Sequence, residues 1–172
     1  MESTEQIIEE YLRFIKNWFY LTDIKFKVRG PKWGSNYSNI DLIAIDDLNN
    51  KVYDIESKFR SAYKYGIADI QAIADQLLRK ERNKAIGQFT KKKPVKVLVI
   101  FKDCFGAEKT GKFQKLESEF HRIIRRAGFD SELWLIENLL VSLREKIKKR
   151  EDKGRYDSGI LQTIRLMNKI KD

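Results

Sequence analysis

Residues 38–58, SNIDLIAIDDLNNKVYDIESK, constrain the fold of this 172-residue chain more than any other stretch. Two apolar runs rich in β-branched residues flank a polar segment of Asp and Asn, which predicts an antiparallel hairpin. If Ile45 pairs with Val52, Asp41 lies opposite Glu56 on the same face of the hairpin. Opposed carboxylates repel each other, so a divalent cation is the obvious compensating charge.

The second strand of this hairpin carries charges at every other position. Period two places Asp54, Glu56 and Lys58 on one face, and Asp54 ranks below Glu56 as a ligand because it lies closer to the turn. The Asp41 and Glu56 carboxylates, with the main-chain carbonyl of Ser57, offer hard oxygen ligands for Mg²⁺ or Mn²⁺. Lys58 would then orient a water or neutralise charge on a phosphate. The competing interpretation is a structural ion pair between Glu56 and Lys58.

Apolar periodicity predicts further elements around the hairpin. They are helices over residues 4–19, 67–85, 113–127 and 138–150, and strands over residues 24–29, 95–101 and 132–136. In the helix over 67–85, we expect Arg79, Lys80, Arg82 and Lys84 to face solvent. A helix between the third and fourth strands permits a parallel crossover, so the order predicts an α/β fold with a mixed sheet covered by helices on both sides.

The hairpin and its surroundings resemble a known family. An N-terminal helix, NID with Asp41, the hairpin, IESK with Glu56 and Lys58, a helix and an apolar strand follow one another. This arrangement resembles the PD-(D/E)xK nuclease superfamily, which includes archaeal Holliday junction resolvases and Mrr-type restriction endonucleases. The resemblance covers roughly residues 4–136, although Ile40 stands where the family usually has proline. It implies a restriction endonuclease-like α-β-β-β-α-β core, with Asp41, Glu56 and Lys58 as catalytic residues.

The same resemblance implies additional site residues and a cofactor. A glutamate of the first helix often joins such sites, and Glu5 fits best, with Glu9 as the second choice. A glutamine on the helix after the lysine strand recurs in some branches, which makes Gln71 a candidate. The cofactor implied is Mg²⁺ or Mn²⁺.

Positive charge predicts a polyanionic partner. Lys and Arg exceed Asp and Glu by 35 to 25, which favours DNA, although a Lys-rich composition also solubilises proteins or reflects a hot growth environment. Cations and aromatic rings flank the predicted site and would contact phosphates or stack on bases; they are Lys32, Trp33, Tyr37, Arg60, Tyr63 and Lys64. Core packing is the other interpretation of the aromatic residues.

The length and the ends of the chain predict its organisation. We expect one nuclease-like domain over residues 1–150, then a charged hinge and an amphipathic helix over residues 151–172. That helix either folds back onto the domain or forms a homodimer. We expect a cytoplasmic protein without a membrane partner, because the sequence has neither a long apolar run nor a signal-peptide pattern. Cys104, the only cysteine, excludes an intrachain disulfide.

These patterns lead to one main functional hypothesis and two rivals. The main hypothesis is a metal-dependent DNA endonuclease that hydrolyses phosphodiester bonds. The first rival is a catalytically inactive nucleic-acid-binding module of the same fold. The second is an assembly protein that acts through its C-terminal helix.

Overall fold

A five-stranded mixed sheet forms the centre of the computed structural model, which describes residues 3–28, 37–58, 64–105, 111–149, 159 and 161–164. The strands lie in the order in which they occur in the chain: β1 (Phe19–Lys27), β2 (Tyr37–Asp46), β3 (Lys51–Lys58), β4 (Val95–Ile100) and β5 (Ser131–Leu135). The predicted α/β class, with a mixed sheet between helices, is confirmed.

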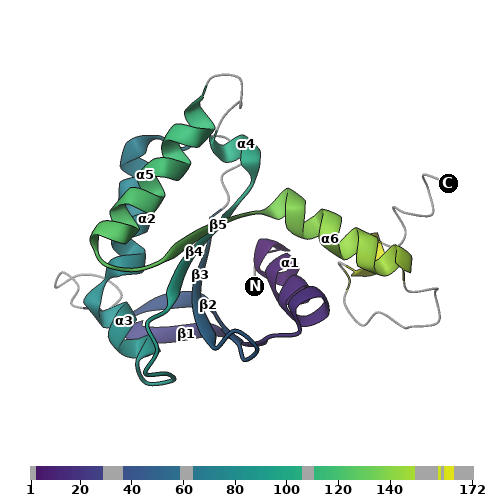
Figure 1. Ribbon diagram of the computed structural model, residues 1–172, viewed down its shortest axis with the longest axis horizontal. Coiled ribbons are helices and arrows are strands. Elements are labelled where there is room, and N and C mark those ends of the chain that lie inside the picture. The colour runs from purple at the N-terminus through teal and green to yellow at the C-terminus, as the bar shows by residue number, and fades with distance from the viewer. Residues whose placement is uncertain are drawn as a thin grey trace.

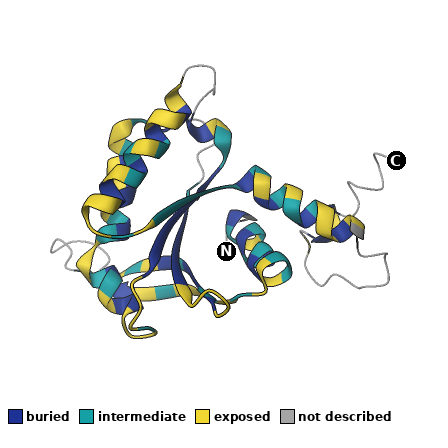
Figure 2. Ribbon diagram, in the orientation of Figure 1, coloured by how far each residue is buried: buried dark blue, intermediate teal, exposed yellow. Residues whose placement is uncertain are grey.

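The register of the hairpin is the one that its sequence predicts. Strands β2 and β3 are antiparallel, with Ile45 opposite Val52 and Leu42 opposite Ile55. Strand β4 runs parallel to both β3 and β5, as the intervening helices predict. Strands β3 and β4 are buried along almost their whole length, and this agrees with their central position (Figure 2).

Helices cover both faces of the sheet (Figure 1). Helices α1 (Ser3–Tyr11) and α6 (Ile136–Lys149) lie on one face, and α2 (Ile67–Leu78), α3 (Lys80–Ile86) and α5 (Lys112–Arg126) lie on the other. A short helix, α4 (Lys102–Phe105), follows β4. The apolar side chains form a separate core on each face, so each helical layer is held by its own buried surface.

The first helix ends earlier than its apolar spacing predicts. Helix α1 continues as a π-helical turn over Leu12–Lys16 and stops at Asn17, which has a left-handed φ of 56°. Because the chain turns there, Phe19 begins β1, and this strand starts five residues before the predicted position 24. The apolar residues near position 19 therefore belong to a strand and not to the helix.

The helix predicted over residues 67–85 is interrupted at Arg79. Its φ of −53° and ψ of 134° are extended, so α2 ends at Leu78 and α3 begins at Lys80 in a new orientation. The prediction that Arg82 faces solvent is wrong, because its side chain is 0% exposed. The break turns Arg82 toward the sheet, where it meets two carboxylates.

The described part of the C-terminal segment lies against the rest of the chain. Leu161 and Ile164 are buried with Leu143 and Ile147 of α6. This packing fits the alternative in which the last helix folds back onto the domain. The other apolar residues predicted for that helix, Ile160, Met167 and Ile170, lie outside the described residues. None of the helices described is long and apolar enough to cross a membrane.

Candidate functional site

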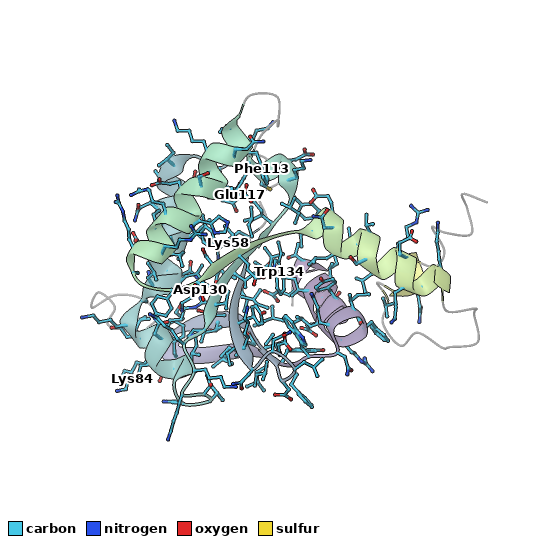
Figure 3. All side chains as sticks on the ribbon, viewed as in Figure 1. Lys58, Lys84, Phe113, Glu117, Asp130 and Trp134 are labelled. Atoms are coloured by element: carbon cyan, nitrogen blue, oxygen red, sulfur yellow. The ribbon has the colours of Figure 1, made fainter. Side chains whose placement is uncertain are left out.

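An open pocket of about 560 Å³ lies at the end of the hairpin where β2 and β3 separate. Its lining comes from β1, β2, β3 and α2 and consists of Lys25, Tyr37, Ser38, Asn39, Asp41, Glu56, Lys58 and Gln76. We call it the site pocket. It brings together the two carboxylates and the lysine that the sequence predicts as a working group, and Figure 3 labels Lys58.

Asp41 lies at the point where the two strands part. The regular pairing ends at Leu42 and Ile55, and the next link is made by a side chain: the Ser57 N–H donates to Asp41 Oδ2 at 2.8 Å. Burial and the neighbouring Glu56 carboxylate raise the pKa of Asp41 from 3.8 to about 7, although the Ser57 hydrogen bond, Lys58 and Arg82 oppose this shift. The pocket therefore favours a proton or a cation at Asp41.

Ser57 connects the site pocket with the helix on the opposite face of the sheet. Its hydroxyl donates to Thr4 Oγ1 of α1 at 3.2 Å. In a strand, the N–H and C=O of one residue point the same way, so the Ser57 carbonyl faces the gap beside Asp41. The carbonyl predicted as a ligand is therefore directed toward the site.

Glu56 is completely buried, and three side chains hold its carboxylate. Gln76 Nε2 of α2 donates to Oε1 at 2.7 Å, Lys58 forms an ion pair with the same oxygen, and Arg82 Nη1 donates to Oε2 at 2.6 Å. These charged hydrogen bonds fix the orientation of the carboxylate. Glu56 and Lys58 thus form the ion pair that the competing interpretation predicts, and both residues line the pocket.

A buried charge network lies behind Glu56. Arg82 Nη2 donates to Asp54 Oδ1 at 2.6 Å, and Lys96 Nζ donates to Asp54 Oδ2 at 2.8 Å. Burial alone would lower the pKa of Arg82, but the carboxylates of Asp54 and Glu56 raise it overall, so the guanidinium stays charged. Asp54 forms ion pairs with these two cations and does not line the pocket. This placement is compatible with the choice of Glu56 over Asp54 as the predicted metal ligand.

The structure does not bring Gln71 to the site. Gln71 is exposed on α2 and donates to Asp75 at 3.0 Å, whereas Gln76, five residues later, reaches Glu56. Sequence reasoning missed Gln76 because the edge of the apolar face includes several polar residues. Gln76 follows the buried residues Ile73 and Ala74 by three and two positions. Residues three apart are neighbours on a helix, so the spacing from Ile73 was the available signal.

The predicted first-helix glutamates lie outside the pocket lining. Glu5 is half-buried on α1, next to Thr4, which accepts a hydrogen bond from the Ser57 hydroxyl. Burial and the charges of Glu10 and Glu5 raise the pKa of Glu9, so a cluster of acids lies on α1. Among the described residues, no three His, Cys, Asp or Glu side chains are grouped closely enough to hold a metal ion.

The predicted nucleic-acid contacts are described only in part. Tyr37 lines the site pocket and is 60% exposed, and Lys64 is exposed just before α2. Lys32, Trp33, Arg60 and Tyr63 lie outside the described residues. Lys25, which the sequence did not single out for the site, lines the pocket because β1 pairs with β2 and places it opposite Asn39.

Comparisons with family models, curated proteins and solved structures give no match to this chain. The function of the chain is therefore inferred from the residues and geometry of the site pocket.

Proposed function

We propose that this protein is a metal-dependent DNA endonuclease of the PD-(D/E)xK type. The observation that carries the proposal is the meeting of Asp41, Glu56 and Lys58 in one open pocket where the hairpin strands diverge. The order of helices and strands, with three antiparallel strands followed by a parallel one, is also compatible with a restriction endonuclease-like core. Fold alone does not establish chemistry, so the pocket is the stronger argument.

The donor set fits a divalent cation. Asp41 and Glu56 supply carboxylate oxygens, and the Ser57 carbonyl faces the same gap. Burial and the Glu56 carboxylate raise the pKa of Asp41, and a cation beside it would oppose this rise. Mg²⁺ prefers few protein ligands together with water and substrate phosphate, so two carboxylates suffice. When bound, Mg²⁺ or Mn²⁺ supplies Lewis-acid chemistry to a phosphodiester and lowers the pKa of water.

Each residue of the pocket has a distinct role in this proposal. Lys58, whose side chain is partly exposed, orients the attacking water or neutralises the charge that develops on the phosphate. Gln76 and Arg82 hold the Glu56 carboxylate, so it needs no reorganisation when substrate arrives. Asp41 supplies the negative charge that attracts the cation.

A nucleic-acid-binding module without catalysis is the second candidate. The observation that favours it is the engagement of both Glu56 oxygens by Lys58, Gln76 and Arg82. A cation must then share Oε1 with two donors or displace Lys58. The assembly protein is less supported, because Leu161 and Ile164 are buried within the chain.

Cleavage of supercoiled plasmid and of branched and linear DNA, with Mg²⁺, Mn²⁺ or EDTA, tests the proposal. We expect nicking that requires the cation and is lost in Asp41→Ala and Lys58→Ala, while Asp47→Ala, on the exposed turn of the hairpin, retains it. Cleavage retained in Asp41→Ala contradicts the assignment. DNA binding without cleavage by the wild type supports the second candidate.

A further inference from the structure

A second pocket adjoins the site pocket along the edge strand β1. It measures about 500 Å³, and its lining from β1 and α3 includes Lys25, Lys27, Glu81 and Lys84. Lys25 lines both pockets, so the two are adjacent at this side chain. We call the second one the flank pocket.

The flank pocket has an excess of positive charge that faces solvent. Lys25, Lys27 and Lys84 are all exposed, against one half-buried acid, Glu81. Within the described ranges, none of the three lysines takes part in an ion pair. Their ammonium groups are therefore available to an external anion, and the shared residue Lys25 places that anion beside the site pocket.

The chemistry of the lining indicates which form of polyanion fits. Phe26, the ring in this lining, is only 5% exposed, because it packs in a core with Ile86. Single-stranded nucleic acid is held largely by stacking of its bases on exposed rings, whereas a duplex presents phosphates outward. A set of exposed ammonium groups over a buried ring matches the duplex backbone.

We propose that the flank pocket binds the phosphate backbone of duplex DNA beside the bond that is cut in the site pocket. This inference rests on the proposed function, and it adds the duplex form of the substrate and the path of its flank. Lys25 holds the backbone where the two pockets meet, and Lys27 and Lys84 hold it further out. Figure 3 shows the two ends of this path, with Lys58 near the centre of the molecule and Lys84 at its edge.

Binding of fluorescently labelled duplex and single-stranded DNA, measured by anisotropy in EDTA, tests the flank pocket. The test variant is Lys27→Ala/Lys84→Ala, and the control is Lys115→Ala/Lys146→Ala, which removes the same charge from exposed positions on α5 and α6. We expect the test variant to bind duplex about fivefold to thirtyfold more weakly than the control. The slope of log affinity against log salt should fall in magnitude by about 2, close to one for each lost contact.

The results separate this inference from the nuclease proposal. Equal losses in the test and control variants overturn the flank pocket, and so does an equal loss for single-stranded DNA. Cleavage by the wild type together with unchanged duplex binding by the test variant overturns the flank pocket but leaves the nuclease proposal intact. Absence of cleavage together with the expected loss of duplex binding supports the flank pocket and contradicts the nuclease.

Discussion

Replacement of Asp41 by Asn tests the electrostatics of the site pocket directly. The amide oxygen of Asn still accepts the hydrogen bond from the Ser57 N–H, but the side chain carries no charge. An acid whose pKa is higher in the folded state binds more protons when folded, so its favourable contribution is present at pH 4 and lost as the pH rises to about 7. We therefore expect Asp41→Asn to be more stable than the metal-free wild type at pH 8.

The size of this effect follows from the pKa of Asp41. The rise from 3.8 to about 7 is close to three pKa units. At about 1.4 kcal/mol per unit, this gives an upper limit of about 4 kcal/mol in the free energy of unfolding. Because the side chain retains some contact with solvent, which screens the charges, we expect a difference of about 1–3 kcal/mol at pH 8.

Urea denaturation in EDTA at several values between pH 4 and pH 8 measures the difference. Asp47→Asn is the matched control, because it makes the same chemical change at an exposed position in the turn of the same hairpin. Titrating groups far from Asp41 contribute equally to both proteins and cancel in the comparison. Parallel pH profiles for wild type and Asp41→Asn would refute the reasoning.

Added Mg²⁺ provides the second half of this experiment. A cation that binds only the folded state stabilises it by mass action. At pH 8 we expect Mg²⁺ to stabilise the wild type more than Asp41→Asn and to reduce the difference between them. A wild type that gains nothing at saturating Mg²⁺ or Mn²⁺ contradicts the cation site.

Three further substitutions test the neighbours of Glu56. Lys58→Met should abolish cleavage, because the ammonium that acts on the water or phosphate is lost. It should not weaken Mn²⁺ binding measured by calorimetry, because the ammonium that occupies Glu56 Oε1 is removed; weaker binding would contradict this role. Arg82→Met should lower the free energy of unfolding by about 3–5 kcal/mol in urea, because it leaves buried carboxylates short of a partner; a loss below about 1 kcal/mol would contradict it. Gln76→Ala should reduce kcat for DNA cleavage, because the hydrogen bond to Glu56 is lost, whereas Gln71→Ala should not. Equal effects of the two substitutions would contradict a positioning role of Gln76.

The sequence predicts the hairpin well because two local signals agree. Two apolar runs rich in β-branched residues predict two strands, and the polar segment of Asp and Asn between them predicts the turn that joins them. The pairs Ile45–Val52 and Leu42–Ile55 follow once the turn segment occupies residues 46–51. Since Asp41 and Glu56 lie in the same register, the central part of the site was predictable as well.

The neighbours that complete the site depend on tertiary structure. The extended backbone of Arg79 interrupts a run without Gly or Pro, so the sequence carries no breaker at this position. A continuous helix predicts Arg82 on the solvent side, but the break rotates it into contact with Glu56. The site role of Lys25 likewise depends on the pairing of β1 with β2, because charge alternation alone cannot show which edge a strand joins.

The charges of the site divide into a fully buried, balanced set and the partly buried charges of the pocket, Asp41 and Lys58. Asp54 and Glu56 are offset by Arg82 and Lys96, so these four together are neutral. Burial and the Glu56 carboxylate raise the pKa of Asp41, and the neighbouring cations Lys58 and Arg82 do not fully offset these effects. A divalent cation beside Asp41 and Lys58 would leave the pocket positive. A phosphodiester carries one negative charge and reduces this excess, so cation and DNA should each increase the affinity for the other by the same factor.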